Sequence, residues 1–185
     1  MIIGLAGTIG SGKGTVVAYL RSKGFAHYSS SRLLGELVEK EGNPKTRDFL
    51  SPMATRLQKE YAGGVIEKNY REKYLSEQPE HAIFEAIHRQ SEADFLRSVG
   101  GKIIGVDADL ETRYARTTLR NEGEKDRQSF EDFKKQARIE DDGEGDASRD
   151  NDIRAVLQRA DVIITNNGTL DELHAQIDAA LAQFA

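Results

Sequence analysis

A glycine-rich segment that ends in a lysine, close to the start of the chain, has the clearest chemistry in the sequence. Residues 7–13 read GTIGSGK and fit the pattern G-x-x-x-x-G-K. Glycine tolerates positive φ and close approach, so consecutive backbone N–H groups can curl around a phosphate, and the lysine adds a point charge. The pattern predicts a loop that binds a nucleoside triphosphate. Its expected ligand-binding residues are Gly10, Ser11, Gly12, Lys13, Gly14 and Thr15.

The surroundings of this loop fit the same chemistry. An apolar run precedes it at residues 2–6, and apolar residues at helical spacing follow at residues 16–20. A helix that begins there points its free N–H groups at the anion. A dinucleotide fingerprint needs a third glycine where Thr15 stands, so that class of site is excluded. A chance glycine-rich turn is the competing explanation.

Carboxylates follow two other apolar runs. Glu85 comes after the run at 81–84, and Asp107 comes after the run at 102–106. Open α/β sheets bind ligands at the carboxyl ends of their strands. Glu85 is therefore a candidate catalytic and Mg²⁺-coordinating residue, and Asp107 is a weaker candidate of the same kind. The alternative for Glu85 is an exposed glutamate at the start of a helix.

A basic stretch lies within an otherwise acidic sequence. Arg113, Arg116 and Arg120 share one face of a predicted helix, and residues 113–138 hold eight basic against five acidic side chains. In residues 139–152 the balance reverses to seven acidic against one basic. Such a stretch can clamp phosphates by neutralising their charge, with Arg113 on the nucleotide and the other two in catalysis. The alternative is an ordinary charged helix with salt-bridge partners.

These residues must be positioned by an alternating series of strands and helices. Five apolar runs predict strands, at residues 2–6, 25–28, 81–84, 102–106 and 161–164. Helical stripes are predicted within residues 16–20, 33–38, 50–61, 110–119 and 170–184. Strands that alternate with helices and are apolar on both faces predict an α/β fold, a three-layer parallel five-stranded sheet with helices on both faces. Apolar residues thin out between 121 and 152, so that segment is expected to be a lid or a solvated loop with a helix inside.

Composition excludes several classes of function. The chain has 185 residues, a net charge of -5 and no cysteine. An acidic balance disfavours nucleic acid as a partner, and the absence of cysteine excludes disulfides and thiolate metal sites. No apolar run is long enough to span a membrane, and the apolar start is not expected to be a signal peptide. We expect a cytoplasmic protein, monomer or homodimer, that acts on small-molecule nucleotides. The four histidines lack ligand spacing, and no N-K-x-D tetrapeptide for guanine occurs.

The loop resembles that of one family in detail. The sequence GSGKGT at residues 10–15 is similar to the P-loop of adenylate kinase and its nucleoside monophosphate kinase relatives, with Ile9 in place of their usual proline. The resemblance implies ATP as donor, Lys13 in catalysis, and Mg²⁺ held largely through water with Thr15 near the phosphates. It further implies a single P-loop kinase domain over 1–185, an acceptor-binding helical region at about 29–78 and a lid-like insertion at about 113–146.

The same resemblance implies the acceptor-binding residues. The segment 27–34, HYSSSRLL, is similar to the start of the acceptor-binding helices, which makes Ser30 and Arg32 candidates, together with Arg47 further on. The family usually has Asp at the place of Arg32 and Arg at the place of Gly35. After the third predicted strand, His88 and Arg89 stand where relatives carry an arginine for the acceptor phosphate. Solvated surface arginines are the alternative.

A turn near the end of the chain carries a second resemblance. Residues 164–170, ITNNGTL, are similar to the strand-to-helix turn that dephospho-CoA kinases and archaeal adenylate-kinase-like proteins place beside the donor base. Asn166 and Asn167 are therefore candidate nucleotide-binding residues. Asn-Gly before a capping threonine is also simply a good turn.

The acceptor can be argued from its chemistry. A hydroxyl acceptor benefits from a base, whereas a phosphate oxygen is already anionic. No carboxylate follows the second predicted strand before Glu36, which favours a nucleoside or deoxynucleoside monophosphate as acceptor. Two alternatives stay open. One is transfer to a hydroxyl, as in dephospho-CoA kinases, with Glu85 as base; the other is a non-catalytic nucleotide-binding module, because Gly35 and His88 replace expected arginines.

Overall fold

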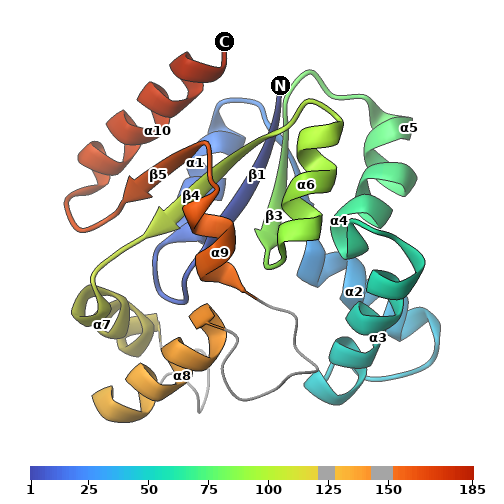
Figure 1. Ribbon diagram of the computed structural model, residues 1–185, viewed down its shortest axis with the longest axis horizontal. Coiled ribbons are helices and arrows are strands. Elements are labelled where there is room, and N and C mark those ends of the chain that lie inside the picture. The colour runs from blue at the N-terminus through green and yellow to red at the C-terminus, as the bar shows by residue number, and fades with distance from the viewer. Residues whose placement is uncertain (121–127, 143–151) are drawn as a thin grey trace.

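The fold is built on one parallel β-sheet. The computed structural model describes residues 1–120, 128–142 and 152–185. Its five-stranded sheet has the order β2-β3-β1-β4-β5, and all pairs are parallel (Figure 1). The strands are β1 (Ile2–Gly7), β2 (Ala26–Ser29), β3 (Ala82–Ile87), β4 (Lys102–Asp107) and β5 (Val162–Thr165). All five predicted strands, and the predicted fold class, are confirmed.

Helices connect the strands and cover both faces of the sheet. Within the described residues they are α1 (Lys13–Ser22), α2 (Ser30–Lys40), α3 (Arg47–Glu60), α4 (Gly64–Asn69), a π-helical turn (Tyr70–Tyr74), α5 (Leu75–Glu77), α6 (Gln90–Ser98), α7 (Leu110–Arg120), α8 (Phe130–Asp142), α9 (Ile153–Gln158) and α10 (Leu170–Phe184). Helices α6 and α9 were not predicted, because each is too short to show a clear helical period, and α4 and α5 lie within the helical region expected at about 29–78 without having been predicted singly. In this described part, no helix is both long and apolar enough to cross a membrane.

The alternation of side chains along β1 divides the core into two layers. Ile3 and Leu5 pack with apolar residues of α1 and α10, and Ile2 and Ala6 pack with those of α6 and α9. Figure 1 shows α1 and α10 on one side of the sheet and α6 and α9 on the other. Because successive residues of a strand face opposite sides, both layers are built from one continuous apolar strand.

The third strand differs from the prediction at its end. It was predicted to end at Phe84-Glu85, and this is wrong by two residues, since β3 continues to Ile87. The register explains the extension: Leu5 lies opposite Glu85 and Ala6 lies opposite Ile87, so Ala86 is an extra, bulged residue. Ala86 has φ of 70°, a conformation that few residues with a Cβ adopt.

The segment expected to be polar contains a packed helix. Phe133 and Ala137 of α8 are 0% and 2% exposed. The Phe133 ring lies 5.6 Å from the ring of Tyr114 in α7. Two apolar residues one helical turn apart suffice to dock α8 against α7, which the low overall apolar density concealed.

Candidate active site

The phosphate loop needs glycine at two positions. Gly10 and Gly12 have φ of 76° and 95°, the left-handed conformation that favours glycine. A Cβ on Gly12 would lie 2.4 Å from Asn166 Nδ2, and one on Gly10 would lie 2.6 Å from the carbonyl oxygen of Arg113. Helix α1 begins at Lys13, directly after this turn. The sequence therefore folds into a tight loop that ends at a helix N-terminus, as the motif predicts.

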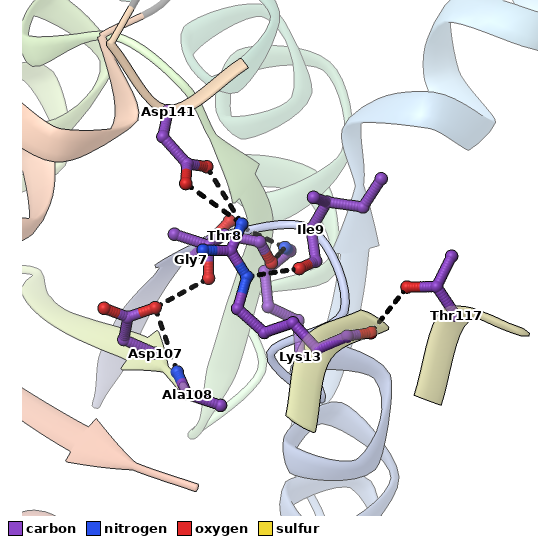
Figure 2. A network of polar contacts seen from close by, with 9 residues as sticks. Gly7, Thr8, Ile9, Lys13, Asp107, Ala108, Thr117 and Asp141 are labelled. Carbon is purple, nitrogen blue, oxygen red and sulfur yellow. Dashed lines mark hydrogen bonds and ion pairs between the residues drawn. The ribbon is translucent and has the colours of Figure 1, made fainter. Parts of the chain in front are cut away.

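Two side chains of the loop are suited to an anion. Lys13 Nζ donates to the carbonyl oxygens of Gly7 and Thr8 at 2.7 and 2.8 Å, so the lysine lies along the loop (Figure 2). The Ser11 hydroxyl is buried and has no hydrogen-bond partner among the described residues. A buried donor without a partner is costly unless a ligand supplies one. The loop thus fits a phosphate group in its donors as well as in its shape.

Asp107 holds the beginning of the loop. Its Oδ1 atom accepts from Thr8 Oγ1 at 2.8 Å and from Ala108 N at 2.9 Å (Figure 2). Thr8 is 3% exposed. Asp107 therefore connects the carboxyl end of β4 to the phosphate loop, a role that its position after an apolar run did not reveal.

Arg113 joins three segments of the chain. Its Nε donates to the Ile9 carbonyl at 2.7 Å, and its Nη2 lies 3.0 Å from Asp141 Oδ2 in α8. Both side chains are buried, and burial raises the pKa of Asp141 although Arg113 opposes the shift. Arg113 lies where the motif predicted a nucleotide contact, and two of its donors already serve the loop and α8.

The turn after β5 is tied to the loop and to α7. Asn166 Nδ2 donates to the Ser11 carbonyl at 2.8 Å, and Arg116 Nη1 donates to the Asn166 carbonyl at 2.8 Å. Asn167 Oδ1 accepts from Asp109 N at 2.8 Å. The structure therefore brings the predicted residues Arg116, Asn166 and Asn167 to the loop. Arg120 ends α7, and its side chain lies outside the described part.

We call the phosphate loop, α7, α8 and the turn after β5 the donor side. The acceptor side consists of the carboxyl ends of β2 and β3, helices α2 to α5, and the β3–α6 turn, which is residues 88–89.

Glu85 pairs with a histidine at the junction of the two sides. Glu85 Oε2 and His27 Nε2 lie 2.7 Å apart, and Ser30 Oγ donates to the Glu85 carbonyl at 2.9 Å. The hydrogen bond with His27, and then the charge of Lys13, hold the pKa of Glu85 below its ordinary value, although burial opposes the shift. The charge of Lys13 therefore reaches Glu85, whose side chain contacts His27.

His88 and Arg89 follow β3 directly. Burial lowers the pKa of His88 to about 4, and the charges of Lys13 and Arg89 add to the shift, so the ring is neutral at pH 7. The Arg89 side chain is 11% exposed, and its Nε has no partner among the described residues. Both acceptor candidates therefore lie in the interior, next to the loop lysine or to each other.

Other predicted residues lie apart from this group. The Arg32 side chain is 56% exposed and donates to the His27 carbonyl, while Arg47, the first residue of α3, is exposed. Gly14 and Thr15 are exposed on the first turn of α1. No cluster of three or more His, Asp or Glu in the described residues is arranged to hold a metal ion. Mg²⁺ would therefore depend on Thr15, Glu85, water and the ligand phosphates.

Four residues of the site were not found from the sequence. They are Thr8, His27, Glu92 and Asp141. Each acts through a partner that is 28 or more residues away or, for Glu92, through a helix too short to be predicted. The only local signal is the three-residue spacing of Arg89 and Glu92, which is typical of a helix start.

Comparison with known proteins gives the family. The family model described as an AAA domain matches residues 3–155. The chain belongs to this family. A UPF0200 protein from Sulfurisphaera tokodaii is 29% identical over 181 residues, which cover 97% of this chain and 95% of that protein.

Two solved structures identify the fold. A shikimate kinase from Aquifex aeolicus has a TM-score of 0.57 at 17% identity, covering 99% of this chain and 97% of its own. A dephospho-CoA kinase from Campylobacter jejuni has a TM-score of 0.57 at 14% identity, covering 100% and 97%. The chain therefore has the P-loop kinase fold.

Proposed function

We propose that the protein transfers the terminal phosphoryl group of ATP to a nucleoside or deoxynucleoside monophosphate. The observation that carries the proposal is the Arg89 guanidinium, two residues beyond the end of β3. Its side chain is 11% exposed, it lies 3.7 Å from the Glu92 carboxyl group, and its Nε has no partner among the described residues. A buried charge is costly unless it is well paired, so an anionic acceptor would complete this site. The kinase names of the two fold neighbours support phosphoryl transfer in general.

The residues present fit such a transfer. The loop N–H groups, the Ser11 hydroxyl and Lys13 would bind the triphosphate, while Thr15 and Glu85 would hold Mg²⁺. The metal would neutralise the charge that develops on the phosphates. An oxygen of the acceptor phosphate forms a bond to the γ-phosphorus as the bond to the bridging oxygen breaks, and ADP leaves. No proton has to be removed from the acceptor, which agrees with the lack of a carboxylate between residues 29 and 35.

A second candidate acceptor is a hydroxyl, as in the dephospho-CoA kinase neighbour's name. The specific observation in its favour is the pair of His27 and Glu85 at 2.7 Å. A histidine oriented by a carboxylate can accept the proton of a hydroxyl. A hydroxyl acceptor needs a base and a phosphate acceptor does not, so an experiment can distinguish the two candidates.

The test is a screen for ADP release from MgATP with every ribo- and deoxyribonucleoside monophosphate and with dephospho-CoA. We expect a monophosphate to be the best acceptor and Lys13→Ala to lower kcat by roughly a thousandfold or more, while the exposed Lys59→Ala retains activity. Release only with dephospho-CoA would establish the hydroxyl candidate instead. ATP binding without ADP release for any acceptor would indicate a non-catalytic module.

A further inference from the structure

Glu92 holds the turn that carries the two acceptor candidates. Its Oε2 atom accepts from the backbone N–H groups of His88 at 2.9 Å and of Arg89 at 3.2 Å. The His88 carbonyl accepts in turn from Asp152 N at 3.1 Å. Glu92 is 3% exposed. One buried carboxyl group therefore fixes the backbone on which both His88 and Arg89 stand.

The other carboxyl oxygen faces the acceptor-side helices. Gly64, the first residue of α4, has φ of 53°, and a Cβ on it would lie 3.3 Å from Glu92 Oε1 and 2.5 Å from Gln58 Oε1. Gln58 Nε2 donates to Ser91 Oγ at 3.1 Å, whereas its Oε1 is buried without a partner in the described part. Glycine at 64 permits this close approach, so Glu92 is enclosed between the β3–α6 turn and α3–α4.

Among the described residues, the charged and titratable groups near Glu92 come from its own turn and from α4. Arg89 lies 3.7 Å away, His88 is neutral, and Asp152 contributes its backbone to the same turn. On the α4 side, Glu67 accepts from Gly63 N at 2.9 Å and from Arg71 Nε at 2.8 Å, so these two charges pair with each other. Burial raises the pKa of Glu92 to about 7, although Arg89 and the two N–H groups oppose the shift.

We propose that Glu92 is a positioning residue of the acceptor site, whose carboxylate holds the His88–Arg89 turn against α3–α4 in the conformation that receives the acceptor's anionic group. The identity of the acceptor in this proposal rests on the proposed function. The contact of Glu92 with the His88 and Arg89 N–H groups does not. The ionised carboxylate accepts both backbone N–H groups strongly, whereas the protonated form accepts them less well. Acceptor affinity should therefore rise as Glu92 ionises.

The first measurement needs no turnover. In ¹⁵N spectra of the unliganded protein between pH 5.5 and 8.5, the amide signals of His88 and Arg89 should shift with a common midpoint near 7. In Glu92→Gln this titration should disappear. Glu67→Gln is the matched control, because it also removes a buried charge, one that accepts from Gly63 N, and should leave the titration in place. Unchanged titration in Glu92→Gln would overturn the proposal.

The second measurement tests whether Glu92 affects binding of the acceptor. With the best monophosphate at pH 8, Glu92→Gln should raise the acceptor KM about tenfold, the loss of roughly one charge-assisted hydrogen bond, with kcat and the ATP KM within about twofold. Glu67→Gln should lower thermal stability without this selective change. If no acceptor is turned over, sulfate, which does not titrate in this range, serves as the probe. The sulfate Kd, measured from the shift of the Arg89 amide signal with sulfate concentration, should then be about tenfold lower in the wild type than in Glu92→Gln.

Failure of the proposed function and failure of the positioning role of Glu92 give different results. An absence of turnover together with selective sulfate weakening would contradict the proposed function and support the role of Glu92. Normal turnover with an unchanged acceptor KM in Glu92→Gln would support the proposed function and overturn that role. Equal sulfate affinity in both proteins would likewise overturn it.

Discussion

The donor side and the acceptor side of this molecule differ in how well their buried and half-buried cations are paired. On the donor side, Lys13, Arg113 and Arg116 all donate to backbone carbonyls, and Arg113 also has a carboxylate at 3.0 Å. On the acceptor side, Arg89 has a carboxyl group at 3.7 Å and an Nε without a partner among the described residues. The donor-side cations are therefore held by protein contacts, whereas Arg89 on the acceptor side is only loosely paired.

This difference fits the chemistry expected of each side. A triphosphate is bound by a loop whose shape must exist beforehand, because many N–H groups have to converge on it. An acceptor is recognised by fewer groups, and a buried cation that lacks a full partner adds selectivity for an anion. The comparison predicts that breaking the protein contacts of the donor side, at Asp141 or Gly12, should mainly affect stability and ATP binding.

The largest effect on stability is expected at Asp141. Asp141→Ala leaves Arg113 buried without its carboxylate, which should lower the free energy of unfolding by about 3–5 kcal/mol. Chemical denaturation followed by circular dichroism measures the change. Glu131→Ala, an exposed residue at the start of the same helix, is the control and should change stability by less than about 0.5 kcal/mol. Equal small losses would show that the ion pair does not hold the donor side together.

A pair of glycines in the phosphate loop tests the donor side a second time. Gly12→Ala combines a φ of 95° with a contact of 2.4 Å to Asn166 Nδ2, so we expect a loss of about 2 kcal/mol and of ATP binding. Gly14→Ala has no atom within 4 Å of the new Cβ and should leave stability unchanged or slightly higher. Calorimetric titration with ATP and thermal melts measure both. A Gly12→Ala protein that melts and binds ATP like the wild type would contradict the geometry.

The sequence predicted the donor side better than the acceptor side, and the reason is local order. Residues 7–15 are consecutive, and their glycine spacing directly reflects backbone needs, so the loop and the strands around it were predicted. Glu85 was found because it follows an apolar run. Its partner His27 is 58 residues away and has no pattern of its own. Pairings of this kind depend on strand order, which the sequence does not state.

The β3–α6 turn shows a second limit of prediction from the sequence. The sequence offered His88 and Arg89 as candidates, which stay predictions. It ended the strand two residues early, since a bulge such as that at Ala86 leaves no signal in an alternation of apolar residues. It also missed Glu92, because α6 buries only two apolar side chains, Ala93 and Leu96. Short helices held by capping and by tertiary contacts carry little periodic signal.

The pH dependence of stability tests whether Glu92 on the acceptor side has a raised pKa. Its folded pKa of about 7 lies above the ordinary value of 4.5, so the folded state binds the proton more tightly than the unfolded state. Stability from this group is therefore fully present below pH 4.5 and is lost as pH rises towards 7, by up to about 3 kcal/mol. Glu92→Gln should remove this slope. Denaturant titrations of both proteins at several pH values measure it, and parallel curves would refute the raised pKa.

The smallest expected effect tests whether the bulge in β3 is strained. Ala86 has φ of 70°, which costs a residue with a Cβ about 1–2 kcal/mol, while glycine at that position loses about 0.5–1 kcal/mol more entropy on folding. Ala86→Gly should therefore raise the free energy of unfolding by up to about 1 kcal/mol. Ala82→Gly, in the same strand without a positive φ and 0% exposed, should instead lower it by about 1 kcal/mol or more. If both variants were destabilised alike, Ala86 would not be strained, and the bulge would owe its conformation to packing alone.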